Sequence, residues 1–320
     1  MQTFERRIFG DAKRLRALVE KARGLGPIRT AVVHAVDAVT LSGAIEAARE
    51  HLIVPILVGP EAKIRAAAKS ANFDLAKYQF VNTEHSDAAA AKAVAMARRG
   101  EVRAIMKGSL HTDELMHAVV DETLGLQTAR RISHVFVAEV PGYPRLMFIT
   151  DAAINVYPTL EDKRDIVQNA IELAQALGVA TPKIAVLSAV ETVSTKIKST
   201  LDAAALCKMA DRGQIIGGIL DGPLAFDDAM SEEVAKTKGI VSPVAGKPDI
   251  LVVPDLDAGN MLAKQFEYIS HATLAGIVAG ARIPIILTGR ADKTASRLAS
   301  SAIALLLVRH GERIAGKAIR

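Results

Sequence analysis

Two points in the sequence place a positive charge between an apolar run and the start of a helical pattern. In the first, Lys107 and Gly108 end an apolar run, and Thr112 with two following acidic residues has the pattern of a helix N-cap. In the second, Arg290 follows an apolar run and Asp292 stands near a helix start. Unpaired N–H groups at a helix N-terminus bind anions, and a nearby cation strengthens that binding. The turns predict a phosphate site, although Arg290 could also be a solvated residue that pairs with Asp292.

Four other motifs of nucleotide-binding or catalytic sites do not occur in the sequence. No G-x-G-x-x-G follows a strand candidate, and Gly246-Lys247 precedes Pro248 instead of the Ser or Thr of a P-loop. No zinc-protease histidine pair and no G-x-S-x-G elbow are found. Cys207 lies among Ala, Leu and Met, which is typical of an unreactive core thiol. Four histidines are expected to be structural: His111, His117, His134 and His271.

Short apolar, β-branched runs alternate with longer helical patterns, which is typical of strand–helix units on a largely parallel sheet. The strand candidates are residues 31–36, 55–59, 104–108, 135–140, 146–150, 183–189, 217–220, 250–254 and 284–288. Residues 159–177 have apolar side chains at helical spacing, with Thr159 as the predicted N-cap and Asp162 in the first turn. The order of these elements predicts an α/β fold.

The length of 320 residues favours two domains, because one hydrophobic core seldom serves so long a chain. Residues 139–146, with two prolines and a glycine between apolar strands, form either a hairpin or a crossing between domains. No long linker is present, so we expect extended strands to connect two lobes and a ligand cleft to lie between them.

Composition excludes several classes of protein. A net charge of +5, 4% aromatic residues and no Trp argue against a nucleic-acid partner. The apolar stretches are too short or too interrupted to span a bilayer, and the first thirty residues do not have the pattern of a signal peptide. With a single cysteine, this pattern predicts a cytoplasmic protein with no membrane partner.

Several segments resemble the phosphate acetyltransferase and phosphate butyryltransferase family. The matching stretches keep their order within residues 31–308: 106–108 (MKG) with 111–112 (HT), 131–135 (RISHV), 149–155 (ITDAAIN) with 158–159 (PT), 221–224 (DGPL), 242–246 (SPVAG), 254–255 (PD) with 258–260 (AGN), and 288–292 (TGRAD). Residues 201–213 and 221–225 resemble the butyryl branch more than the acetyl branch.

The resemblance implies a two-domain α/β fold like that of the isocitrate and isopropylmalate dehydrogenases, with parallel-rich sheets and an interdomain cleft. Domain 1 would comprise residues 1–145 and 279–320, and domain 2 the inserted residues 146–278. The implied reaction is acyl-CoA plus phosphate to acyl phosphate plus CoA, with CoA as a substrate and no organic cofactor or catalytic metal. A homodimer or higher homo-oligomer is also implied.

The same resemblance assigns roles to individual residues. Arg290 stands at the family's catalytic arginine, Arg131 at an arginine associated with substrate or CoA phosphate, and Asn155 at a position that lines the cleft. The further positions expected to bind substrate, phosphate or CoA are Lys107, Gly108, His111, Thr112, Ser133, Asp151, Asp221, Asp255, Asn260 and Gly289. Each also has a structural alternative: Asp221 in a strand-ending turn, Asp255 and Asn260 as helix caps, and Lys107 extending from a sheet edge.

One departure from the family concerns the base for the CoA thiol. Acetyl members place an acidic residue six positions after the arginine, where this chain has Ser296. Asp292 is present two positions after the arginine, and it is either the base or a structural carboxylate in the first helical turn.

Two other functions fit part of this pattern. A non-catalytic acyl-CoA or acyl phosphate-binding module would keep the fold but lose Arg290 or Asn155, and both are present. A metal-dependent dehydrogenase of the same fold would need an acidic metal-binding cluster, which the sequence does not display. The acyl chain length, from acetyl to butyryl size, stays open because a methylene or two changes binding by only ~1–3 kcal/mol.

Overall fold

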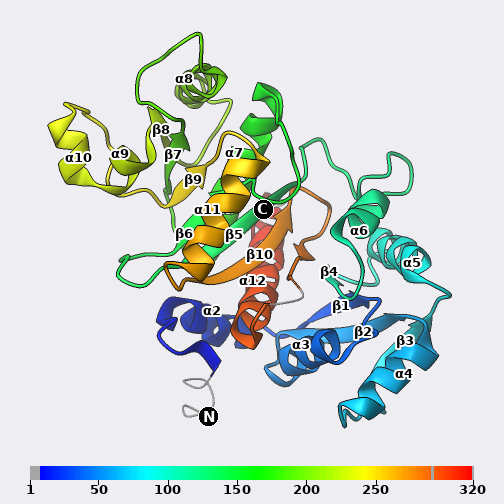
Figure 1. The fold of residues 1–320 in the computed structure, drawn as a ribbon. Helices are drawn as coiled ribbons and strands as arrows, with labels where there is room; N and C mark the ends of the chain where they lie inside the picture. Colours follow the sequence, from blue (N-terminus) through cyan, green and yellow to red (C-terminus); the bar gives the residue numbers. More distant parts are fainter. Residues whose placement is uncertain (1–7, 290–291, 319–320) are drawn as a thin grey trace. The chain divides into compact units, whose positions relative to one another are not determined.

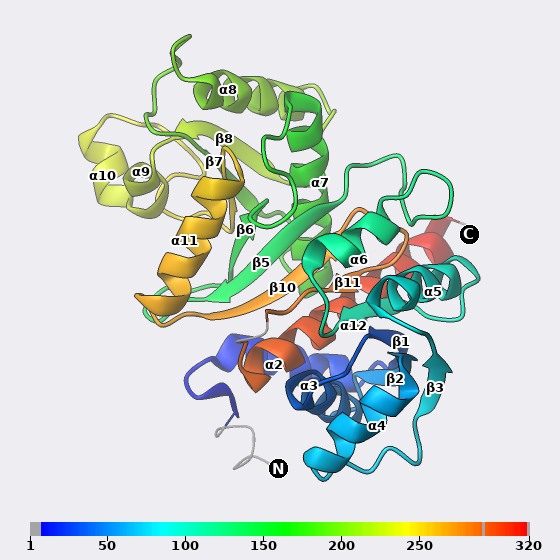
Figure 2. The same cartoon turned by 45° about the vertical axis from the view of Figure 1, so that its right-hand side comes forward.

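The computed structural model describes residues 8–289 and 292–318 and divides into two units. Unit 1 comprises Met1–Arg130 with Ala275–Arg320, and unit 2 comprises Arg131–Leu274. Each unit is an α/β sheet with helices packed on it, as the ribbons show (Figures 1 and 2). The expected α/β fold class is therefore confirmed.

Unit 1 combines the first part of the chain with its last helix. Its elements are α2 (Lys13–Arg23), β1 (Ile28–Val33), α3 (Ala38–Arg49), β2 (Ile53–Gly59), α4 (Glu61–Ser70), β3 (Gln79–Asn82), α5 (Ser86–Arg98), β4 (Ala104–Lys107), α6 (Thr112–Val119), β10 (Thr273–Ala279, from residue 275 onward), β11 (Ile285–Ile286) and α12 (Thr294–Ala318). The strand order is β3-β2-β1-β4-β11-β10. The helix α12 packs against α2 and α3.

The sheet of unit 1 is parallel from β3 to β11, and only β10 runs antiparallel to its neighbour. Ile28 of β1 pairs with Ile53 of β2, and Val33 pairs with Lys107 of β4. The central strands β1 and β4 are mostly apolar and, apart from the exposed Arg29, buried, as expected where helices cover both faces of a parallel sheet. Because β1, β4 and β11 run in the same direction, their carboxyl ends meet at one edge of the sheet.

Unit 2 is the inserted segment. Its elements are β5 (Ser133–Glu139), β6 (Met147–Thr150), α7 (Leu160–Leu177), β7 (Lys183–Leu187), α8 (Lys198–Asp211), β8 (Ile219–Leu224), α9 (Phe226–Met230), α10 (Glu232–Thr237), β9 (Ile250–Val252) and α11 (Leu256–Tyr268). The strand order is β5-β6-β9-β7-β8, parallel except for the β5–β6 pair. The helix α7 packs on β5, β6 and β9, and α11 packs on β6.

Residues 139–146 form the turn of a hairpin, one of the two alternatives expected from the sequence. The strand β5 pairs antiparallel with β6, so that Val135 lies opposite Thr150. This pairing holds β5 in unit 2, and the division between the units falls at residues 130/131 and 274/275, away from the expected 145/146 and 278/279.

The helix over residues 159–177 is also found. The Thr159 side chain accepts a hydrogen bond from the Asp162 N–H, and the Asp162 carboxylate accepts one from the Thr159 N–H. Two strands had no counterpart among the expected ones: the edge strand β3, which has only two apolar residues, and β10, whose pattern lies within a longer apolar stretch. None of the described helices is both long enough and apolar enough to cross a membrane.

Candidate functional site

A cavity of about 530 Å³ lies at the carboxyl edge of the unit 1 sheet. Its lining comes from the segments that follow three parallel strands, an edge where open α/β sheets commonly bind ligands. Asp37 and Thr40 follow β1, residues 108–111 follow β4, and Thr288 with Gly289 follows β11. Arg297 of α12 and Glu114 of α6 also line it. Three of the expected binding residues, Gly108, His111 and Gly289, therefore share one cavity.

The turn after β4 is packed directly on the end of β1. A Cβ atom on Gly108 would lie 2.1 Å from the Val33 carbonyl oxygen and 2.9 Å from the His34 carbonyl oxygen. The Ser109 N–H donates to the same His34 carbonyl at 3.0 Å. Only glycine allows this approach, so Gly108 fixes where the turn lies. Lys107, the last residue of β4, is buried beside it.

The N-terminus of α6 is held by a carboxylate of its own first turn. The Glu114 carboxylate accepts from the His111 N–H at 2.6 Å and from the Ser86 hydroxyl at 2.8 Å. These hydrogen bonds, first from His111 and then from Ser86, lower the pKa of Glu114, so it stays charged. Glu114 thus ties the start of α6, at Thr112, to the start of α5.

Arg297 is a buried cation in this cavity that the sequence analysis missed. Its guanidinium donates to the Thr288 hydroxyl at 3.1 Å and to the Gly289 carbonyl at 2.8 Å. A Cβ on Gly43 of α3 would lie 2.8 Å from the Arg297 Cδ, so the glycine makes room for the side chain. Burial lowers the pKa of Arg297, and the charges of Asp292 and Asp37 oppose that shift. A lone arginine among small residues, as in residues 294–302, is the signal that could have identified it.

Arg290 and Ala291 lie outside the described residues, but the positions on either side are described. The Asp292 carboxylate accepts from the Gly289 N–H at 2.8 Å. A Cβ on Gly289 would lie 2.7 Å from an Asp292 carboxylate oxygen, so this carboxylate occupies the space that a side chain at position 289 would use. The Asp292 carboxylate thus bonds the backbone of Gly289, and Asp292 itself lies two positions before α12 begins. Ser296, at the family's acidic position, is buried in α12.

In unit 2, the buried carboxylate of Asp151 organises the loop after β6. One oxygen accepts from the backbone N–H groups of Ala153 and Ile154, at 2.9 and 3.1 Å. The other accepts from the Asn155 amide at 2.6 Å and from the His134 N–H at 3.2 Å. Burial raises the pKa of Asp151, and these hydrogen bonds oppose the increase. The Asp151 side chain is enclosed by its own loop, and its carboxylate fixes the position of the Asn155 amide.

Asn155 is buried, and its amide connects the Asp151 carboxylate to the Arg131 side chain. Its amide nitrogen also donates to the Ile132 carbonyl at 2.9 Å, and its oxygen accepts from the Arg131 Nε at 2.7 Å. The Arg131 side chain is 55% exposed, and its Nε lies 3.6 Å from an Asp162 oxygen. Among the described residues, its two terminal nitrogens have no hydrogen-bond partner, so they can hold an anion while Nε is fixed.

A second polar side chain, missed in the sequence, supports the same segment. Asn169 of α7 donates to the Arg131 carbonyl at 2.8 Å and to the Ser133 hydroxyl at 2.9 Å. Ser133 is completely buried, so its place is structural support beneath Arg131. The sequence signal for Asn169 was an amide residue within the apolar face of the helix predicted over residues 159–177.

The start of α11 packs on the same loop. Asp255 is the N-cap of this helix, and Asn260 donates to the Ala152 carbonyl at 3.2 Å. A Cβ on Gly259 would lie 2.9 Å from the Asp151 carbonyl oxygen. Arg131, Ser133, Asp151, Asn155 and Asn260 are thus linked in one region, with Asp255 at the start of the helix that carries Asn260.

Asp221 is not part of that network. It lies within β8 and accepts from the Gly222 N–H at 2.9 Å. Cys207 lies nearby, its thiol 3.7 Å from the Gly222 carbonyl. Burial raises the pKa of Cys207 to about 12, which agrees with the expected unreactive thiol. Within residues 8–289 and 292–318, no cluster of three His, Cys, Asp or Glu side chains could hold a metal ion.

A family described as "Phosphate acetyl/butaryl transferase" matches residues 87–305, which is more than half of the chain. The chain belongs to this family. It is 60% identical to the phosphate acetyltransferase of Rhizobium meliloti over 90% of this chain and 92% of the relative. It is 38% identical to the phosphate butyryltransferase of Clostridium beijerinckii over 92% of this chain and 98% of the relative. The crystal structure of a branched-chain phosphotransacylase from Enterococcus faecalis V583 matches with a TM-score of 0.77 and 30% identity, covering 88% of this chain and 99% of that one.

These values confirm the family expected from the sequence and correct one detail. The short segments that suggested the butyryl branch, residues 201–213 and 221–225, do not represent the whole chain. Over nearly the full length, identity to the acetyltransferase of Rhizobium meliloti is well above identity to the Clostridium butyryltransferase.

Proposed function

We propose that the protein catalyses reversible transfer of an acyl group between CoA and inorganic phosphate: acyl-CoA + phosphate = acyl phosphate + CoA. The observation that carries the proposal is 60% identity, over 90% of the chain, to a phosphate acetyltransferase. The same similarity favours an enzyme over a non-catalytic binding module of this fold. The same similarity disfavours the dehydrogenase alternative, because that relative is a phosphate acetyltransferase.

We propose direct attack within a ternary complex. A phosphate oxygen forms a bond to the thioester carbonyl carbon, and the carbon–sulfur bond breaks. The CoA sulfur leaves with the electron pair and takes the proton that the attacking hydrogen phosphate loses. This step requires phosphate held against the carbonyl and positive charge where the oxyanion develops. A covalent enzyme intermediate on Cys207 is disfavoured, because burial holds the pKa of that thiol at about 12.

For the phosphate and the developing charge, we propose Arg290 as the principal group. Two features support this assignment. Arg297 donates to the Gly289 carbonyl, and Asp292 accepts from the Gly289 N–H, so the residue preceding Arg290 is held from both sides. Lys107, at the end of the adjacent strand β4, adds a buried cation at the same sheet edge.

For CoA or its phosphate groups, we propose Arg131 as an anion-binding side chain. Asn155 holds its Nε at 2.7 Å and leaves the terminal nitrogens available. Asn155 is then a positioning residue, supported in turn by the buried Asp151.

We propose acetyl-CoA as the preferred thioester, on the basis of the acetyltransferase relative. The test is release of free CoA from acetyl-, propionyl-, butyryl- and longer acyl-CoA, each with and without phosphate. The proposal predicts phosphate-dependent release, fastest with the acetyl thioester. A folded protein that releases no CoA in response to phosphate, from any thioester, would be a binding module instead; faster release from butyryl-CoA would refute only the acetyl preference.

A further inference from the structure

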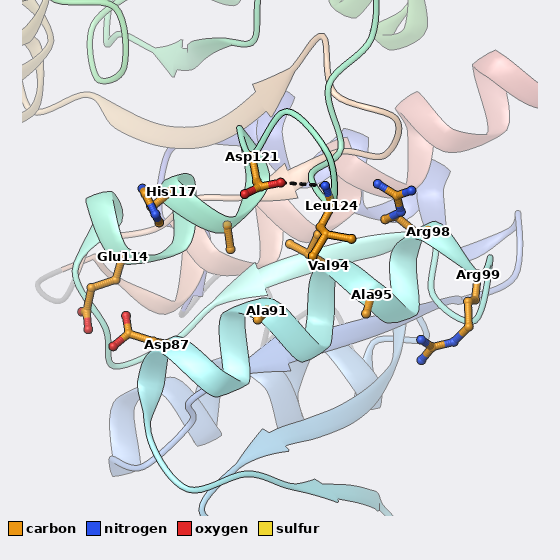
Figure 3. A pocket seen from close by; sticks show the side chains of 11 residues that line it. Asp87, Ala91, Val94, Ala95, Arg98, Arg99, Glu114, His117, Asp121 and Leu124 are labelled. Carbon is orange, nitrogen blue, oxygen red and sulfur yellow. Dashed lines mark hydrogen bonds between the residues drawn. The ribbon is translucent and has the colours of Figure 1, made fainter.

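A separate groove of about 470 Å³ lies between α5 and α6 in unit 1 (Figure 3). Small apolar side chains form much of its wall: Ala91, Val94 and Ala95 from α5 and Ala118 from α6. Leu124 covers part of it from the loop after α6, although its side chain is 65% exposed. The volume falls in the range of small-molecule sites.

The charged residues of the groove are separated along α5. Figure 3 shows Arg98 and Arg99 at one end, and Asp87 and Glu114 at the other. Arg98 ends the helix about one turn after Ala95. Figure 3 shows its guanidinium pointing toward the loop after α6, whereas the Arg99 guanidinium points away from that loop.

Two of the three carboxylates that line the groove, those of Asp121 and Glu114, are already bonded within the protein. Asp121 accepts from the Thr123 and Leu124 N–H groups at 2.9 and 2.6 Å, as the dashed line to Leu124 marks in Figure 3. Glu114 accepts from the His111 N–H and the Ser86 hydroxyl. Neither carboxylate is a strong site for a cationic ligand.

Arg98, in contrast, keeps donors for a ligand. One terminal nitrogen of Arg98 donates to the carbonyls of Thr123 and Gly125, at 2.5 and 3.3 Å, which fixes the side chain at the groove. In the described part of the chain, the Arg98 Nε and second terminal nitrogen have no partner. Arg99 is already ion-paired, because its Nε donates to the Glu101 carboxylate at 2.5 Å. The Nε and the second terminal nitrogen lie on one edge of the Arg98 guanidinium, and two donors on one edge suit a carboxylate.

We propose that this groove is an effector site for a small monocarboxylate with an apolar body. The carboxylate would bind the free edge of the Arg98 guanidinium, and the hydrocarbon part would lie along the alanine wall. Glu114 lines both this groove and the cavity at the strand ends, and it fixes the N-terminus of α6. A ligand that shifts Glu114 would therefore displace His111 in that cavity, and this half of the inference rests on the proposed function.

Binding is tested with hexanoate as the probe, measured by calorimetry and ligand-observed NMR on the full chain. Hexanamide and hexylamine are the matched neutral and cationic probes. We expect saturable hexanoate binding, about tenfold weaker binding of hexanamide because a charge-assisted contact is lost, and no binding of hexylamine. Equal binding of all three probes would overturn the carboxylate assignment.

Two substitutions locate the site. Ala91→Phe fills the groove from an exposed position on α5, and Ala66→Phe places the same side chain on the exposed face of α4 as a control. Hexanoate affinity should fall at least about tenfold in Ala91→Phe and stay unchanged in Ala66→Phe. Unchanged affinity in a folded Ala91→Phe protein would show that hexanoate binds elsewhere and would overturn the proposal.

The effector role has its own readout. Saturating hexanoate should change the KM for phosphate in the wild-type and Ala66→Phe enzymes and have no effect in Ala91→Phe. Binding equilibria are reciprocal, so phosphate should change hexanoate affinity by the same factor. Hexanoate binding with no effect on phosphate, in either direction, would overturn the effector half. Failure of the proposed function would instead be an enzyme without phosphate-dependent CoA release, while hexanoate still binds.

Discussion

Arg131 illustrates how buried neighbours can prepare a half-exposed cation. The Asp151 carboxylate orders the Asn155 amide, and the amide holds the Arg131 Nε. Folding has already fixed the long Arg131 side chain, so little of its conformational entropy is lost when an anion binds. This favours anion binding. The same principle applies to Arg297, which fixes the Gly289 carbonyl next to Arg290.

Arg290→Gln should reduce turnover on the order of 10²-fold or more, because it removes charge from the developing oxyanion and from phosphate. Melting temperature should change little. Arg282→Gln, an exposed arginine of unit 1, is the control and should keep full turnover. Near-normal turnover in a folded Arg290→Gln enzyme would remove Arg290 from the mechanism.

Asp292→Asn should keep turnover within about threefold and leave the acidic limb of the pH–rate profile unchanged. The reason is that the Asp292 carboxylate bonds the Gly289 N–H, and an amide oxygen can accept the same hydrogen bond. Loss of the charge near Arg297 should cost about 0.5–1.5 kcal/mol of stability. Asp257→Asn, an exposed helix-start carboxylate, is the control. A large fall in turnover, with loss of the acidic limb, would instead identify Asp292 as the general base.

His134 should make the protein sensitive to acid. Its ring is fully buried against Phe136, and burial lowers the pKa of His134 to about 3. Below pH 6.5 the imidazole of His134 takes up a proton in the unfolded chain but stays neutral in the folded chain. The free energy of unfolding therefore decreases as the pH falls from 6.5 toward 3. Between pH 7 and 5 the loss should be about 2 kcal/mol in urea unfolding. His134→Leu should remove that part of the pH dependence; an identical dependence in the variant would show that the ring is protonated in the folded state.

At the scale of elements, the unit 1 cavity depends on where three parallel strands end. The loops after β1, β4 and β11 contribute to it because those strands run side by side in the same direction. The turn after β4 is the most constrained, since it contacts the end of β1 through backbone atoms.

Gly108→Ala should destabilise the protein by about 3 kcal/mol or more and raise the KM for phosphate, because the new Cβ would overlap the Val33 carbonyl. Gly311→Ala is the matched control in α12, where the added Cβ has nothing within 4 Å. It should stabilise the helix by about 0.5–1 kcal/mol and leave activity unchanged. Equal stability of the two variants would contradict the close packing of the turn.

At the scale of the whole molecule, we predict catalysis by the protein's own cations, with CoA as a substrate and no resident metal. Dialysis against EDTA, followed by assay in metal-free buffer, should leave turnover within about twofold, since arginine and lysine can supply the charge stabilisation. Restoration of a lost activity by one divalent cation would show a metal requirement, and calcium and magnesium additions separate the candidates.

The sequence alone determined the alternation of strands and helices, the capped helix at 160–177 and the cationic turn after β4, because each depends on neighbours along the chain. The sequence motifs also identified the family. The tertiary structure decided which polar residues act together. Asp37, Glu114 and Arg297 join the strand-end cavity, and Asn169 joins Arg131, through contacts between residues distant in sequence. Periodicity reports burial and local geometry, whereas the partner of a buried polar group depends on which strands pair and in what register.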